Sequence, residues 1–162
     1  IAQEAGLARR MIRHYIGNRE DVIYAAVERI IKNFTQSIFE TIDKFEDNER
    51  FNATIDYIFS EAFNALPATK LVASLLAVSL YDDQVCKAVK TLYDSFHLGL
   101  DQKIHEKMPN IAEAPRLQAA YSIMCLSFGG GWMRNIGFDP RLNIQNKQIA
   151  QSLIDQLILA NN

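Results

Sequence analysis

The sequence predicts an all-α fold, and three observations lead to this prediction. Apolar residues recur every three or four positions along nearly the whole chain, which is the period of a helix with one buried face. No segment alternates apolar and polar residues over the length that a strand needs. Only 7 glycines and 4 prolines interrupt the 162 residues, of which 49% are hydrophobic and 22% charged. This composition is typical of one soluble globular domain and excludes a disordered chain.

Six helices are predicted after residue 20 from this apolar spacing. They cover residues 21–45, 55–66, 68–80, 83–108, 115–132 and 144–160. The first has the longest apolar stripe, so we expect a helix of about 25 residues, or about 38 Å, that links two parts of the molecule. Asp82 and Asp83 would cap the fourth helix, and Pro109 would end it. Pro115 fits the first turn of the next helix.

The first 24 residues show a different pattern. Residues 1–7 fit a short helix ended by Gly6, since glycine accepts the left-handed geometry of a tight turn. Residues 8–16 fit a second short helix, which Gly17 and Asn18 separate from the long helix. Two short helices around a glycine turn form a helix-turn-helix, in which the second helix lies in the DNA major groove.

Basic charge is concentrated in this segment. Residues 1–19 contain four arginines and one acidic residue, a net charge of +3, whereas the other 143 residues carry a net charge of −5. The pI of about 5.9 argues against a protein that coats nucleic acid along its whole surface. Arg9 and Arg10 would begin the second short helix, and Arg13 and His14 would follow one turn later. Guanidinium groups suit guanine edges and phosphates.

These residues resemble a known family. The motifs Ile1-Ala2, Ala5-Gly6-Leu7, His14-Tyr15 and Gly17-Asn18-Arg19-Glu20-Asp21-Val22 are similar to the end of the DNA-binding domain of tetracycline-repressor-like (TetR/AcrR family) transcriptional regulators. The resemblance covers about 22 of the 162 residues, and the remainder agrees in the number and length of its helices. The family's first helix has no counterpart in the sequence. Ala8 stands where the family usually has a serine that caps the recognition helix.

The resemblance implies a homodimeric regulator, by family default a repressor, that a small-molecule effector releases from its DNA operator. Residues 1–32 would be the C-terminal part of the DNA-binding domain, and residues 33–162 the ligand-binding and dimerisation domain. The residues expected to contact DNA are Arg9, Arg10, Arg13, His14, Tyr15 and Arg19.

The same resemblance implies two sites in the body. The last two long helices of each subunit would form a four-helix bundle, although the same stripes could face the monomer core. The expected interface residues are Leu117, Tyr121, Ile149, Leu153, Ile154, Leu157 and Ile158. The effector would bind in a mostly apolar cavity, although ordinary core packing explains the same aromatic spacing. The expected lining residues are Phe59, Phe63, Tyr93, Phe96, His97, Met124 and Phe128.

Other kinds of site have less support. A solvated helix face explains Asp94, Asp101 and His105, with His97 nearby, better than a metal site does, because no second group of ligands converges on them. Cys86 and Cys125 form no CxxC pair and are expected to be buried. The sequence has no HExxH, GxSxG or phosphate-binding glycine motif, so neither an enzyme nor a cofactor is expected.

A helical small-molecule carrier or adaptor without DNA binding is the alternative interpretation. It would explain the helical body and treat the match in the first 22 residues as accidental. Binding to an operator distinguishes the two. The regulator function, together with the lack of a secretion signal or a membrane-spanning segment, leads to the expectation of a cytoplasmic protein.

Overall fold

The computed structural model describes residues 6, 8–15, 17–65 and 67–160, and this part of the chain contains eight helices and no strand. The all-α prediction is therefore confirmed. The helices are α1 (Arg9–Tyr15), α2 (Arg19–Ile42), α3 (Asp47–Ile58), α4 (Glu61–Ala65), α5 (Pro67–Ser79), α6 (Asp83–Lys107), α7 (Glu113–Asn135) and α8 (Arg141–Leu159). None of these helices is both long enough and apolar enough to cross a membrane.

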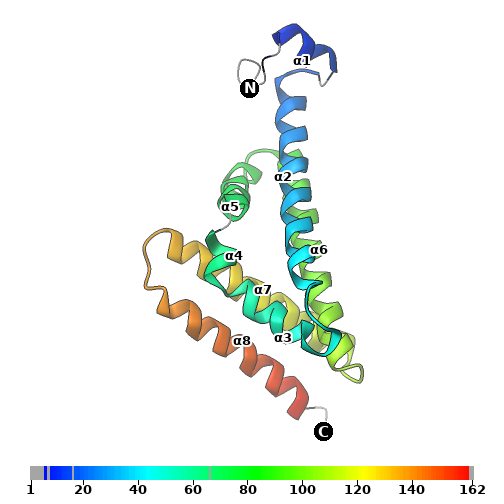
Figure 1. Ribbon diagram of the computed structural model, residues 1–162, viewed down its shortest axis with the longest axis vertical. Helices are drawn as coiled ribbons and strands as arrows, with labels where there is room; N and C mark the ends of the chain where they lie inside the picture. Colours follow the sequence, from blue (N-terminus) through cyan, green and yellow to red (C-terminus); the bar gives the residue numbers. More distant parts are fainter. Residues whose placement is uncertain (1–5, 7, 16, 66, 161–162) are drawn as a thin grey trace.

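The helices form a body with one projecting end (Figure 1). Helices α2 and α6 run side by side along the long axis of the molecule, and α7 and α8 pack together across its lower part. Helices α3 and α4 cross the body, while α1 sits beyond it at the far end of α2. The long helix predicted from residue 21 is thus confirmed as the connection between two parts of the molecule.

Several helix boundaries differ from the prediction: α2 ends at Ile42, α3 begins at Asp47 and α7 continues to Asn135. The helix expected over residues 55–66 is divided into α3 and α4, which are separated at Phe59 and Ser60. The last helix begins at Arg141 rather than near Ile144, because Pro140 precedes its first turn, where proline's missing N–H costs no helical hydrogen bond. The helix predicted over residues 1–7 falls outside the described residues apart from Gly6, which has the left-handed φ of +64°.

Side chains from three helices bond the backbone where α3 ends. Ser127 Oγ of α7 donates to the carbonyl oxygen of Ile58 at 2.8 Å, and Asn143 Nδ2 of α8 donates to that of Phe59 at 2.9 Å. Asn64 Nδ2 of α4 donates to the carbonyl oxygen of Ser60 at 3.0 Å. The last carbonyls of a helix have no partner within it, so these buried amides and hydroxyl complete their bonding.

Two glycines of α7 make room for this contact. A Cβ at Gly131 would lie 2.1 Å from Oδ1 of Asn64, and one at Gly130 would lie 2.4 Å from Oδ1 of Asn143. A Cβ at Gly129 would meet nothing within 4 Å. Gly130 and Gly131 therefore allow α8 and α4 to approach α7 closely within one subunit.

A cluster of aromatic rings lies between two groups of buried side chains, one around Ile55 and Ile123 and the other around Phe34 and Leu92. Phe63 is fully buried, and its ring is surrounded by rings from α2, α3, α6 and α7 at centroid distances between 5.6 and 6.3 Å. The surrounding rings are those of Phe34, Tyr57, Phe96 and Phe128. Their angles range from tilted to edge-on, which suits the charge distribution of aromatic rings.

Both cysteines are exposed, so the expectation that they are buried is wrong. Cys86 lies next to the buried Val85 in the first turn of α6, and Cys125 follows the buried Met124 on α7. Consecutive residues of a helix point about 100° apart, so each cysteine is turned away from its buried neighbour.

Substitution of Gly131 by alanine tests the close approach of α4 to α7. We expect Gly131→Ala to lower the free energy of unfolding by about 1 to 3 kcal/mol, because its Cβ would displace the buried Asn64 amide. Gly129→Ala is the matched control and should raise that free energy by up to about 1 kcal/mol, since its Cβ points into open space. Chemical denaturation measures both. Equal effects at the two positions would contradict the packing described here.

Candidate functional site

The projecting end of the molecule consists of α1 and the start of α2 (Figure 1). Gly6 makes a left-handed turn before α1, and the carbonyl of Ala8 accepts the first turn's N–H from Met11 at 2.8 Å. Arg10 and Arg13 are both exposed on α1, and neither makes a hydrogen bond or ion pair with another residue that the structure describes. Two guanidinium groups one turn apart are thus available to an external partner.

The other residues expected to contact DNA lie on or beside this helix. His14 and Tyr15 are exposed, and their rings pack edge to face with centroids 5.0 Å apart. Arg9 and Arg19 begin α1 and α2, but their side chains are outside the described part of the structure. The structure therefore brings the described candidates together on one short helix.

A reciprocal cap fixes the joint between α1 and α2. Asn18 Oδ1 accepts the backbone N–H groups of Glu20 and Asp21 at 2.8 and 3.0 Å, and Asp21 Oδ2 accepts that of Asn18 at 2.7 Å. Gly17 has a φ of +119°, and a Cβ there would lie 2.3 Å from Asp21 Oδ2. This arrangement is a capping box, and it confirms the helix break predicted at Gly17 and Asn18.

The start of α2 is also bonded to the start of α6. Asp82 Oδ1 caps α6 by accepting the N–H groups of Gln84 and Val85 at 2.9 and 3.0 Å, and its Oδ2 accepts the hydroxyl of Tyr24 at 3.1 Å. The bond from Val85 and those from Tyr24 and Gln84 hold the pKa of Asp82 below its ordinary 3.8. Burial, and then the bond to Asp82, raise the pKa of Tyr24. The base of the projecting end is thus bonded to the body.

One cavity of the body lies between α4, α5, α6 and α7 and has a volume of about 240 Å³. Its walls are mostly apolar, and amide and hydroxyl groups of Asn64, Thr69, Tyr93 and Asn135 are the polar exceptions. Burial raises the pKa of Tyr93 to about 12, with a smaller contribution from Cys125, so its phenol remains a neutral hydrogen-bonding group. We call this space the α4–α7 cavity.

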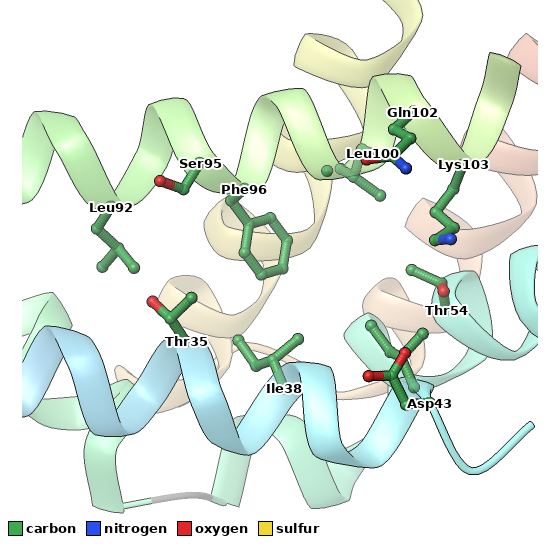
Figure 2. Close-up of a pocket in the computed structure, with 12 residues that line it drawn as sticks. Thr35, Ile38, Asp43, Thr54, Leu92, Ser95, Phe96, Leu100, Gln102 and Lys103 are labelled. Atoms are coloured by element: carbon green, nitrogen blue, oxygen red, sulfur yellow. The ribbon is translucent and has the colours of Figure 1, made fainter.

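A second cavity lies between α2, α3 and α6 and has a volume of about 220 Å³ (Figure 2). Leu92, Phe96 and Ile38 line its apolar part, whereas Asp43 and Lys103 stand at its other end. We call this space the α2–α6 cavity. Its charged end distinguishes it from the α4–α7 cavity, whose lining residues are all uncharged.

The residues expected to bind an effector do not lie together, and most are divided between the two cavities and the buried core. Tyr93 and Phe128 line the α4–α7 cavity, and Phe96 lines the α2–α6 cavity. The buried core contains Phe59, Phe63 and Met124. His97 Nε2 donates to the carbonyl of Leu117 at 2.8 Å. Sequence reasoning missed Asn64, Thr69 and Asp43, because isolated polar residues on different helices give no periodic signal.

The residues expected at a dimer interface are also divided. Ile149 is 50% exposed and borders a groove between α7 and α8, whereas Ile154 is only 1% exposed and belongs to the core. Leu157 packs against the same core, and the ring of Tyr121 lies 6.0 Å from that of His97 on α6. The others are half-buried or exposed, namely Leu117, Leu153 and Ile158.

The polar residues considered for a metal site bond to neighbouring side chains or backbone. Arg116 donates to both carboxylate oxygens of Asp101, at 2.5 and 3.2 Å, and to His105 Nδ1 at 3.0 Å. Asp94 pairs with Lys90 on the same helix. Among the residues that the structure describes, no three His, Cys, Asp or Glu side chains converge as metal ligands would.

Comparison with known proteins places the fold. No protein-family model matches the sequence, and no curated protein matches it either. A crystal structure from Pseudomonas aeruginosa PAO1, described as a "putative transcriptional regulator", superimposes with a TM-score of 0.70 at 16% sequence identity. The match covers 96% of this chain and 77% of that one. The two proteins share a fold.

The pH dependence of unfolding tests the Asp82 bonds. The folded pKa of this carboxyl is lowered, so its contribution is present above its ordinary pKa of 3.8 and is lost as the pH falls through the folded value. We expect Asp82→Ala to be less stable than the wild type at pH 6, and the difference to shrink below about pH 4. Asp155→Ala, at an exposed residue of α8 that makes no hydrogen bond or ion pair with the described residues, is the control. A difference independent of pH would contradict the assignment.

Proposed function

We propose that this protein is a DNA-binding regulator of transcription that resembles the TetR family. The observation that carries the proposal is the exposed pair Arg10 and Arg13 on α1, a short helix that projects beyond the body. The glycine turn before α1 and the capped break after it are the geometry of a recognition helix. The description of the Pseudomonas protein as a regulator supports the same function.

In this proposal α1 enters the DNA major groove. Arg10 and Arg13 are three residues apart, so they project from the same side of the helix. Their planar guanidinium groups bond to guanine edges or to phosphates, and Tyr15 adds a hydroxyl for the DNA backbone. Residues 1–32 then read DNA, and residues 33–162 form the ligand-binding and dimerisation domain. A protein with this task works in the cytoplasm.

We propose a homodimer formed through the groove between α7 and α8. Met133, Leu142 and Ile149 border this groove and are between 45% and 50% exposed, and Phe138 beside them is 53% exposed. Arg134 and Asp139 lie among these apolar side chains, an apolar centre with polar groups that is typical of an interface between subunits. Two copies related by a two-fold axis would cover each other's groove and place two α1 helices on two half-sites of one operator.

The α4–α7 cavity is the proposed effector site. Its lining residues are uncharged, so it suits an apolar neutral molecule that bonds to amide or phenol groups. Helix α5 forms one wall and leads directly to Asp82, which bonds to Tyr24 near the start of α2. A ligand that displaces α5 would therefore shift α2 and α1, and release a repressor from DNA. The coupling of such switches is about 1 to 3 kcal/mol.

Removal of the two arginines tests DNA binding. We expect Arg10→Ala with Arg13→Ala to weaken binding to the selected operator at least about tenfold at fixed salt, because two charged contacts are lost. The operator is first selected from random duplex DNA with the wild type. We expect it to be a palindrome with half-sites about 10 base pairs apart or somewhat more. Fluorescence anisotropy then measures the dissociation constants.

The matched control for this experiment removes the same charge from the body. Lys44 and Lys70 are exposed and have no partner among the described residues, so Lys44→Ala with Lys70→Ala should bind DNA like the wild type. If no sequence is enriched in the selection, the regulator is excluded and the carrier interpretation takes its place. Equal losses in the two double variants would indicate nonspecific attraction instead of a recognition helix.

A charge in the α7–α8 groove tests the dimer. Ile149→Asp should raise the dissociation constant of the dimer about tenfold or more, because the carboxylate would be buried without a partner. Leu71→Asp introduces the same charge at a 47% exposed residue of α5 and should leave the dimer unchanged. Light scattering over a concentration series measures the mass. A wild-type monomer at all concentrations would disprove this interface.

A further inference from the structure

We infer that the α2–α6 cavity is a second small-molecule site, which takes a cationic amphiphile, meaning an apolar molecule with one protonated amine. The site is separate from the proposed effector cavity and does not depend on DNA binding. Its existence follows from the shape of the cavity, the bonding of its polar groups and one glycine of α6.

The cavity is mostly apolar, and its charged groups stand at one end, which we call its polar end; the hydroxyls of Thr35 and Ser95 lie near Leu92 at the other. Figure 2 shows Leu92, Phe96 and Ile38 facing one another between α6 and α2, and Asp43 and Lys103 farther along the same space. The volume of about 220 Å³ is many times the ~10–15 Å³ of such space that one water molecule needs, so the cavity has room for a small organic ligand. One aromatic ring with a short chain is a ligand of this kind.

The bonding of the polar end favours a ligand that donates hydrogen bonds. Lys103 Nζ already donates to Glu106 Oε2 at 2.6 Å, and Gln102 Nε2 donates to the other oxygen of that carboxylate at 3.0 Å. The hydroxyl of Thr54 donates to a backbone carbonyl one turn earlier, so its oxygen is left as an acceptor. Acceptor groups of the polar end thus remain available to a ligand.

Asp43 gives the site its charge preference. It directly follows α2, lines the cavity and makes no hydrogen bond or ion pair with any residue that the structure describes. The Lys103 bond lowers the pKa of Glu106, so those two charges match each other. Asp43 is left as the unmatched charge of the lining, and an ammonium group of a ligand would pair with it.

Gly99 keeps the space open. It lies in the middle of α6, where glycine is less favourable than alanine because it loses more conformational freedom on folding. A Cβ at this position would meet nothing within 4 Å, so no neighbouring atom requires a glycine there. Gly99 lines the cavity, and any large side chain at this position would occupy the volume.

Three probes of similar shape and different charge test the site. They are 2-phenylethylamine, which is a cation at pH 7, the neutral 2-phenylethanol and the anion 3-phenylpropanoate. Isothermal titration calorimetry of the purified protein should give the order cation, neutral molecule, anion, from tightest to weakest. Absence of binding by all three probes, equal affinities, or a preference for the anion would each overturn the proposal.

Variants locate the binding and its charge preference. Gly99→Leu should abolish binding of the cation while the thermal unfolding transition is retained. Asp43→Asn should weaken binding of the cation up to about fivefold, the range of a partly exposed ion pair, and leave the alcohol unaffected. Glu28→Gln removes an exposed carboxylate of α2 outside the cavity and should change neither affinity.

A further variant separates the two cavities. Ala73→Leu fills space in the α4–α7 cavity and should leave binding of the 2-phenylethylamine cation unchanged. Retention of binding in Gly99→Leu, or its loss in Ala73→Leu with the fold intact, would place the amine elsewhere and overturn the proposal. If Gly99→Leu fails to fold, Asp43→Asn decides between the outcomes. Weaker binding of the cation with unchanged binding of the alcohol supports the site, and unchanged binding of the cation overturns it.

Discussion

The contact between the end of α3 and helices α7 and α8 is the constraint on which the arrangement of the body depends. Buried carbonyls without partners are costly, and here Ser127 and Asn143 supply donors from 69 and 84 residues away. These bonds set where the last two helices dock against α3. Gly130 and Gly131 are needed at the same place because the polar side chains occupy the volume of a Cβ. The groove between α7 and α8 is lined by these two helices and the loop that joins them.

The projecting end depends on one local cap and one bond between residues distant in the sequence. The capping box of Asn18 and Asp21 orients the start of α2, and the bond from Tyr24 to Asp82 joins that start to α6. Farther along, Phe34 and Ile38 of α2 are buried in the core. One continuous helix, α2, therefore runs from the joint with α1 into the packed body.

The two cavities differ in charge because different helix faces line them. Apolar side chains and neutral amide or hydroxyl groups line the α4–α7 cavity, whereas Asp43, which directly follows α2, and Lys103 of α6 also line the α2–α6 cavity. Burying a charge is costly, and Asp43 is an exposed residue. The two cavities therefore differ in charge, although a ring of the same aromatic cluster lines each of them, Phe96 in one and Phe128 in the other.

The sequence by itself determined the all-α class, most of the long helices, the left-handed conformation of Gly6, the break at Gly17 and the basic character of α1, because periodicity, capping and glycine geometry are local properties. Tertiary structure decided the division between α3 and α4, where donors from the distant α7 and α8 bond to the carbonyls of Ile58 and Phe59. It also decided that Phe63 fills the core while Tyr93 and Phe128 border a cavity. Aromatic residues at helical spacing look the same in both settings, and only the neighbouring helices determine whether space remains beside them.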